Sequence, residues 1–280
     1  MRSMPLLLTP VIEPVVPAGL LATARAVRMG AHGLLSSPFV LLGRGLFYVI
    51  LLVVLSSFWD VAAHRVDPAA LAHVPGAGLA IYVGVTEWLT LSTPALYLRL
   101  EDDIRTGAIE AQLLRPKPYL VMRIAEAAGA MAVRMAWLGA VALTLLAVSG
   151  RTAPPWPAFA GLLVLGPLAG LNALLCNALA GLTAFWARRT LAAFLVLQKL
   201  AFILGGLAAP VTLYPPWLAR LAQASPFAAQ TYWPAALTLE PSWRVFILAL
   251  ISQTVWLALT ALAIAAVWRA GLRKILRTGV

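Results

Sequence analysis

Long apolar runs constrain this chain more than any other feature of its sequence. Six runs approach the roughly 20 residues that cross the hydrocarbon core of a bilayer as a helix, and we expect spans over residues 45–63, 77–98, 124–149, 158–186, 191–211 and 245–268. The chain is 62% hydrophobic and only 11% charged, whereas a soluble domain carries about 25% charged residues. Lipid must therefore surround most of it, and we expect an all-α polytopic membrane domain over residues 39–280.

Residues 1–38 contain no continuous span, because Glu13 and several prolines interrupt the apolar residues. Farther on, Arg25, Arg28 and His32 are spaced three and four apart, with leucines on another face. That pattern favours a helix lying in the membrane interface rather than crossing it. We expect residues 1–38 to form an irregular lead-in followed by this interfacial helix.

The basic residues set the expected orientation. Most of the 21 Lys and Arg residues fall near the N-terminus, after the second and fourth spans, and at the C-terminus. Cytosolic segments of membrane proteins carry such an excess, so both termini and the 100–118 segment are expected in the cytosol. The net charge of +11 needs no nucleic-acid partner, because the basic residues are scattered between spans.

The 100–118 segment, LEDDIRTGAIEAQLLRPKP, is the one long polar stretch between two spans. Its apolar spacing predicts one short amphipathic helix. Three acids favour the positive end of a helix dipole at its start, Gly107 weakens the middle, and prolines end it. The alternative is an ordinary solvated loop whose charges set the topology.

Residues 212–243 form a second unusual segment, too interrupted by proline to be a span and too apolar to sit in water. We predict two short helices hinged near Ser225–Pro226, dipping into the outer leaflet as a re-entrant pair. Aromatic residues of the kind that anchor at the interface occur along it. The residues that define this outer element are Pro215, Trp217, Pro226, Tyr232 and Trp233.

Three charged residues stand inside the predicted spans: Glu87, Arg134 and Lys199. Each lies roughly 15–18 Å from the inner flank of its span, counted at 1.5 Å per residue. Charges at that depth usually face a bundle interior or a cavity, which predicts an intramembrane pair with Glu87 or a polar translocation path. The alternative is that the two cations extend along their helices to the head groups.

Enzyme motifs are absent from the sequence. There is no G-x-x-x-x-G-K-[ST] phosphate loop, no HExxH and no G-x-S-x-G elbow, and the single Cys176 forms no metal-binding pair. We therefore expect no catalytic residues, no metal and no cofactor on this chain.

Two stretches make the chain resemble the permease subunits of ABC-2 type export systems. One is DIRTGAI (103–109) followed by LLRP (113–116); the other is LYPPWL (213–218) followed by SPF and YWPA. The first is similar to the family's coupling-helix segment, the second to its outer re-entrant pair.

The resemblance implies a transmembrane subunit of an ATP-driven exporter of a small molecule, lipid or peptide in the bacterial inner (plasma) membrane. Its implied partners are two copies of a separate ATPase, which bind ATP and Mg²⁺, and a second permease, identical or homologous. The ATPase would press on this coupling segment: Glu101, Asp102, Asp103, Ile104, Arg105, Gly107, Ile109, Leu113, Arg115 and Pro116. In this interpretation the charged residues form salt bridges with a groove on the ATPase, and the apolar ones fill it. The alternative is an ion-driven secondary transporter or a non-transporting membrane scaffold.

Overall fold

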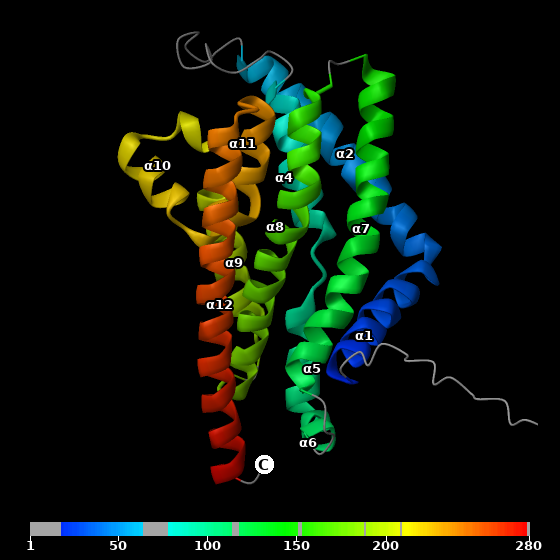
Figure 1. Cartoon of the computed structure of the whole chain (residues 1–280), viewed down its shortest axis with the longest axis vertical. Coiled ribbons are helices and arrows are strands. Elements are labelled where there is room, and N and C mark those ends of the chain that lie inside the picture. The colour runs from blue at the N-terminus through cyan, green and yellow to red at the C-terminus, as the bar shows by residue number, and fades with distance from the viewer. Residues whose placement is uncertain are drawn as a thin grey trace, which may run out of the picture.

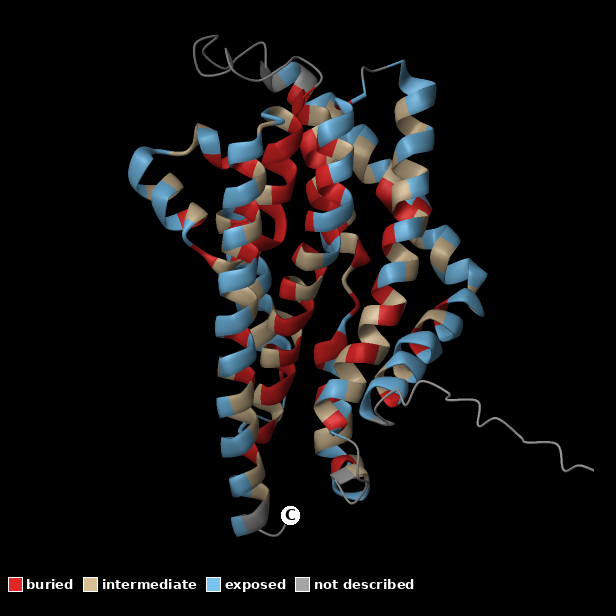
Figure 2. Ribbon diagram, in the orientation of Figure 1, coloured by how far each residue is buried: buried red, intermediate tan, exposed pale blue. Residues whose placement is uncertain are grey.

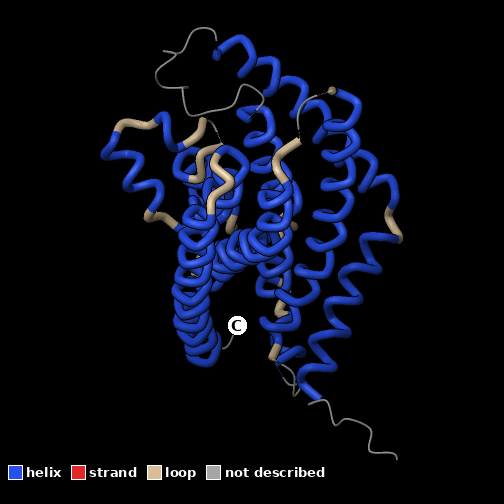
Figure 3. The backbone as a smooth tube through the Cα atoms, turned by 45° about the horizontal axis from the view of Figure 1, so that its top comes forward, coloured by secondary structure: helices blue, strands red, loops and turns tan. Residues whose placement is uncertain are grey.

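The computed structural model of the chain describes residues 18–63, 78–113, 118–150, 153–187, 189–207 and 209–278. All regular secondary structure within those ranges is helical, and helices make up almost all of the trace in Figure 3. The expected all-α class is confirmed. The longer helices are α1 (Ala18–Leu35), α2 (Pro38–Ala63), α4 (Gly78–Ser92), α5 (Leu96–Arg105), α7 (Tyr119–Ser149), α8 (Trp156–Leu182), α9 (Leu191–Leu204) and α12 (Trp243–Thr278).

Shorter helices fill the connections. They are α6 (Ala108–Leu113), the 3₁₀ turns η1 (Thr183–Phe185) and η2 (Val211–Leu213), α10 (Pro216–Gln223), the π-helical turn η3 (Ala228–Tyr232) and α11 (Trp233–Leu239).

Four of the expected spans are helices long and apolar enough to cross a membrane. They cover Pro38–Trp59, Tyr119–Ser149, Trp156–Phe185 and Trp243–Ile275. In the third of these helices, 50% of the 18-residue stretch assessed for hydropathy is buried, compared with 11% in the first helix. The helix α8 is therefore the centre of the bundle, and α2 presents most of its surface outward, as Figure 2 also shows.

The predicted spans 77–98 and 191–211 are not single helices of spanning length. The first is broken after Ser92, because Pro94 has no N–H and disfavours helical backbone in the residue before it. The second ends at Leu204, followed by Gly205 and by Gly206 with a φ of +73°. The helix α9 has 14 residues, about 21 Å at 1.5 Å per residue, which is short of the ~30 Å hydrocarbon core. The six-span count is therefore not met by the described helices.

The two ends of the bundle differ. In Figure 1, α5, α6 and the C-terminal end of α12 lie at one end, and α10, α11 and the start of α4 lie at the other. We call the first the α5–α6 end. The N-terminal helix α1 crosses α7 on this half of the molecule, and its placement in the membrane interface stays a prediction.

Two glycines bring α1 and α7 into backbone contact. A Cβ on Gly30 would lie 1.8 Å from the carbonyl oxygen of Glu126, and one on Gly129 would lie 1.9 Å from that of Val27. Both distances are far below a van der Waals contact, so only glycine fits at these positions. Small residues permit this kind of close helix approach in membrane proteins.

The 212–243 segment contains two helices with a break at Ala224–Ser225, close to the predicted hinge. Pro215 precedes the first helix, in which Trp217 is 65% exposed, and Pro226 follows the break. Trp233 is partly buried and its indole N–H donates to the Gln223 carbonyl oxygen at 3.3 Å.

The interfacial role predicted for Tyr232 is wrong. Its side chain is 5% exposed and belongs to the same apolar cluster as Tyr82 and Leu165. The π-helical turn that carries it packs against α4, α8 and α12 and so turns it inward.

Candidate functional site

The segment between α4 and α7 is built from two helices instead of the single one predicted for 100–118. The first, α5, begins at Leu96, directly after the break at Pro94, and ends at Arg105. Gly107 then adopts a φ of +73°, a conformation that side chains disfavour, and α6 starts at Ala108. Gly107 therefore does not merely weaken the helix; it ends it. Leu113 is the last residue of α6, and Arg115 and Pro116 lie outside the described residues.

This earlier start changes the role of the acids. Glu101, Asp102 and Asp103 lie in the second half of α5, not in its first turn. The predicted stabilisation by the positive end of a helix dipole is therefore wrong, since that effect is confined to the first turn. Two of the three carboxylates instead accept hydrogen bonds from residues outside α5.

Glu101 is buried and is tied to the start of α9. Its Oε2 accepts hydrogen bonds from the Thr190 backbone N–H at 2.8 Å and from the Thr190 hydroxyl at 2.6 Å. Its Oε1 lies 3.6 Å from one guanidinium nitrogen each of Arg105 and Arg189. The bonds from the Thr190 hydroxyl and N–H hold the pKa of the Glu101 carboxyl below its usual value, although burial acts in the opposite direction. The carboxylate is therefore ionised at neutral pH and holds α5 against α9.

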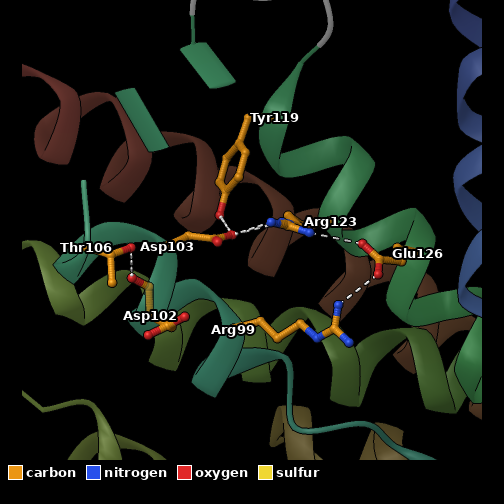
Figure 4. A network of polar contacts seen from close by, with 7 residues as sticks. All are labelled: Arg99, Asp102, Asp103, Thr106, Tyr119, Arg123 and Glu126. Atoms are coloured by element: carbon orange, nitrogen blue, oxygen red, sulfur yellow. Dashed lines mark hydrogen bonds and ion pairs between the residues drawn. The ribbon is translucent and has the colours of Figure 1, made fainter. Parts of the chain in front are cut away.

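Asp103 connects α5 to α7, as Figure 4 shows. Its Oδ2 accepts a hydrogen bond from the Tyr119 hydroxyl at 2.6 Å and one from Arg123 Nε at 2.8 Å. Arg123 also pairs with Glu126 at 3.1 Å, and Glu126 in turn pairs with Arg99 of α5 at 2.8 Å. Charge alternates along this chain of contacts, so each group is partly neutralised by its neighbours. Because the Asp103 and Arg123 side chains are only 13% and 21% exposed, solvent screens this pair less than a surface pair.

Apolar contacts hold α5 and α6 from a third side. Leu100 and Ile109 are 0% and 1% exposed and belong to one apolar cluster with residues of α8. The Tyr97 ring stacks on Phe194 of α9 with centroids 4.0 Å apart. At Gly181 of α8 an added Cβ would lie 2.9 Å from the Tyr97 Cα, so α5 and α8 approach closely there. Together these contacts fix α5 to α7, α8 and α9.

The predicted groove-filling role of Ile109 conflicts with its position, because a side chain buried within this chain cannot also fill a groove on another protein. Ile104 is partly buried against the same cluster. Between Asp102 and Ala111 the exposed residues are Asp102, Arg105, Thr106, Glu110 and Ala111. The segment thus has a face anchored to three helices and a short polar exposed face.

The three intramembrane charges are not brought together. Glu87 is 9% exposed on α4, whereas Lys199 is exposed on α9. Among the described residues no ion pair joins Glu87 to Arg134 or Lys199, so the predicted pair is not formed. The Nε of Arg134 is buried without a hydrogen-bond partner among those residues.

A cavity of about 710 Å³ lies between α2, α4, α7 and α8, towards the end opposite α5–α6. Its walls are mainly apolar and include Trp88, Leu146 and Phe159, with the hydroxyl of Tyr48 bonded to the Gly84 carbonyl oxygen at 2.7 Å. None of the three predicted path residues is part of its lining. An apolar group fits these walls better than a charged one.

Sequence reasoning missed the partners of the acids. Arg123 had a local signal, because Glu126 follows it at the i,i+3 spacing of a helical pair. Thr190 carries no local signal, because its contact with Glu101 spans 89 positions of the chain. Gln253 was also missed: it is fully buried in α12 and its amide donates to the carbonyl oxygens of Leu165 and Ala229.

Comparison with known families identifies the family of this chain. The model of the ABC-2 family transporter proteins matches residues 77–279, which include α4 to α12 and the whole α5–α6 segment. No curated protein matches the sequence significantly. Since the family model covers well over half of the 280 residues, the chain belongs to the ABC-2 family of transporter proteins.

Proposed function

We propose that this chain is the transmembrane subunit of an ATP-driven ABC export complex and that α5–α6 is the element on which a separate ATPase acts. The observation that carries the proposal is the two-sided construction of this segment. Glu101 and Asp103 are turned inward and bonded to α9 and α7, while Asp102, Arg105 and Glu110 remain exposed. A device that transmits force needs both a rigid attachment and a free contact face.

The attachment explains how a push would spread. Displacing α5 moves Thr190 at the start of α9 through Glu101, and moves the start of α7 through Asp103 and Arg123. Its close packing at Gly181 passes the same displacement to α8, the central helix. Packed elements of this kind move as units instead of deforming continuously.

The surroundings of the complex follow from the same proposal. Two ATPase copies would bind ATP and Mg²⁺, and a second permease, identical or homologous, would complete the path. The chain would sit in a bacterial inner membrane with the α5–α6 end and both termini in the cytosol. The apolar walls of the 710 Å³ cavity favour cargo with an apolar part.

An ion-driven secondary transporter or a non-transporting scaffold is the competing function. Neither needs an ATPase, and ion-driven transport by the purified chain alone would favour the first of them. The feature that supports an ion-driven transporter is a buried ionisable residue within a predicted span, since Glu87 is buried on α4.

Co-purification tests the proposal. The double variant Asp102→Ala, Glu110→Ala removes exposed carboxylates from α5 and α6 and leaves the anchoring residues in place. We expect it to capture much less ATPase and to lose ATP-dependent transport. The control, Arg220→Ala with Arg244→Ala, removes two exposed charges at the opposite end of the bundle and should leave both readouts unchanged. Undiminished ATPase capture and undiminished ATP-dependent transport in the Asp102, Glu110 variant would contradict the proposal.

A further inference from the structure

A group of hydrogen-bonding side chains lies inside the bundle, where α8, α12 and the π-helical turn η3 meet. Gln253 of α12, Asn172 of α8 and Gln230 of η3 belong to it, and all three are buried. Gln253 follows Trp243, the first residue of α12, by ten positions, which is about 15 Å along a helix. That distance is half of the ~30 Å hydrocarbon core. The meeting point of η3 with the bundle is therefore deep in the membrane-spanning part of α12.

The π-helical turn leaves one backbone carbonyl without its usual donor. In a π-helix each carbonyl oxygen accepts from the N–H five residues later, and the Trp233 N–H donates to the Ala228 carbonyl oxygen in this way. The next donor in the series would be Pro234, which has no N–H. The Ala229 carbonyl oxygen instead accepts a hydrogen bond from Gln253 Nε2 at 3.2 Å. Because backbone polar groups at membrane depth must be satisfied by the protein, the Gln253 amide allows η3 to lie there.

The same amide joins three elements. Its second hydrogen bond goes from Gln253 Nε2 to the Leu165 carbonyl oxygen of α8, at 3.1 Å. The Asn172 side chain donates from α8 to the Gln253 backbone carbonyl oxygen at 3.2 Å. Within the same group, Gln230 of η3 donates to the Cys176 sulfur of α8 at 3.1 Å. Side chains thus attach η3 to α8 both directly and through α12.

This attachment is a modest one for a fully buried contact. Oε1 of Gln253 is buried and accepts no hydrogen bond from the residues that the structure describes. A buried acceptor without a donor costs free energy, and a hydrogen bond between membrane helices contributes little net stability. The hydrogen bonds of the group therefore favour the attached position of η3 only slightly, as a contact that opens and closes requires.

From these contacts we propose that Gln253 is a positioning residue for transport. Its amide holds η3, and with it α10 and α11, against α8 at rest, and this contact parts when the partner ATPase acts. The two helices α10 and α11 lie at the end of the bundle opposite α5–α6 (Figure 1), and α8 connects the two ends, since α5 packs closely on it at Gly181. The parting rests on the proposed function, whereas the role of Gln253 at rest concerns this chain alone.

The chain contains its own reporter for this contact. Cys176 is its single cysteine, and Gln230 of η3 bonds to it, so its rate of reaction with a maleimide measures the parting of η3 from α8. The rate is measured on the purified full chain in detergent, and thermal unfolding is followed in parallel. The variant Gln253→Met keeps the length of the side chain and removes its donors. The control is Thr254→Val, because Thr254 is exposed and its hydroxyl bonds to the Leu250 carbonyl oxygen within α12.

We expect Gln253→Met to speed the reaction of Cys176 by roughly tenfold, which corresponds to the loss of two hydrogen bonds between membrane helices. Gln253→Asn keeps the amide on a side chain one methylene shorter and should give an intermediate rate. The control Thr254→Val should stay within about twofold of the wild type. An unchanged rate in Gln253→Met, or an equal rise in Thr254→Val, would overturn the role of Gln253.

A second substitution separates positioning from general stability. Pro234→Ala restores a backbone N–H five residues after Ala229, so adding it to Gln253→Met should return the rate towards that of the wild type. A lower unfolding temperature in Gln253→Met, without this return, would show a general loss of stability and would also overturn the role.

The complex with its ATPase tests the parting. The reaction of Cys176 is compared with ATP and Mg²⁺ and without nucleotide. We expect ATP to speed it in the wild type, and to have little effect in Gln253→Met, where η3 is already released. A wild-type rate that does not respond to ATP, in a complex that contains the ATPase, would overturn the parting and leave the proposed function standing. Failure to capture any ATPase would instead contradict the proposed function.

Discussion

Replacing Glu101 by Gln should loosen the start of α9 without removing the exposed contact face. The Glu101 carboxylate accepts two hydrogen bonds from Thr190, at 2.8 and 2.6 Å. A hydrogen bond to a charged group contributes about 1.5–3 kcal/mol and a neutral one about 0.5–1.5, so neutralising this acceptor costs about 1 kcal/mol per bond. The 3.6 Å pairs with Arg105 and Arg189 add little, because those side chains are 44% and 75% exposed.

The total of about 2 kcal/mol corresponds to a roughly 30-fold rise in local opening. Amide hydrogen exchange measures this opening directly at Thr190, whose N–H donates to Glu101, and at Phe194, whose N–H donates to the Thr190 carbonyl oxygen. Asp102→Asn is the matched control, because it removes one charge from the neighbouring position, whose exposed side chain faces outward. We expect Glu101→Gln to speed exchange and lower ATP-driven transport while still capturing the ATPase. Asp102→Asn should leave exchange unchanged and should reduce capture of the ATPase. Unchanged exchange in Glu101→Gln would refute the reasoning.

Three further outcomes follow from the same contacts. Gly129→Ala would place a Cβ 1.9 Å from the Val27 carbonyl oxygen, so it should separate α1 from α7 and lower the unfolding temperature. The control is Gly33→Ala on α1, where an added Cβ meets nothing within 4 Å. This control should leave stability unchanged or raise it by up to ~1 kcal/mol. Because the pKa of Glu101 is lowered in the folded chain, the stability that Glu101 contributes is fully present above the usual glutamate pKa. That contribution is lost as the pH falls through the lowered pKa. The free energy of unfolding should therefore fall less steeply with decreasing pH in Glu101→Gln than in the wild type. Ile109→Ala removes a side chain that is 1% exposed and should lower the free energy of unfolding by about 2–5 kcal/mol. Equilibrium denaturation measures this loss, and a loss below about 0.5 kcal/mol would contradict the prediction.

Much of the architecture was predictable because apolar runs of spanning length specify membrane helices with little ambiguity. Four predicted spans appear as such helices, and the break in the outer element falls near the predicted Ser225–Pro226 hinge. The span over 77–98 failed at a residue visible in the sequence: Pro94 interrupts the helix. An average of hydrophobicity over about 20 residues does not reveal a break caused by a single residue.

The candidate site was predictable in place but not in detail. The 100–118 segment was correctly singled out as an unusual polar connection, but the start of α5 at Leu96 moved all three acids away from the helix N-terminus. The inward roles of Glu101 and Asp103 depend on Thr190 and Arg123, which are remote in sequence and come close only through packing. No local periodicity contains that information. The predicted pairing of Glu87 with Arg134 or Lys199 failed for the same reason: a similar depth in different spans does not by itself bring side chains together.

Site-specific cross-linking from α6 tests the central claim most directly. A cross-linking residue is placed at exposed Glu110 and, for comparison, at exposed Trp217 on α10 at the opposite end. If α5–α6 receives force from a separate ATPase, the Glu110 position should cross-link to that ATPase and the Trp217 position should not. Cross-linking to the ATPase from Trp217 alone, or from neither position in an actively transporting membrane, would contradict the account.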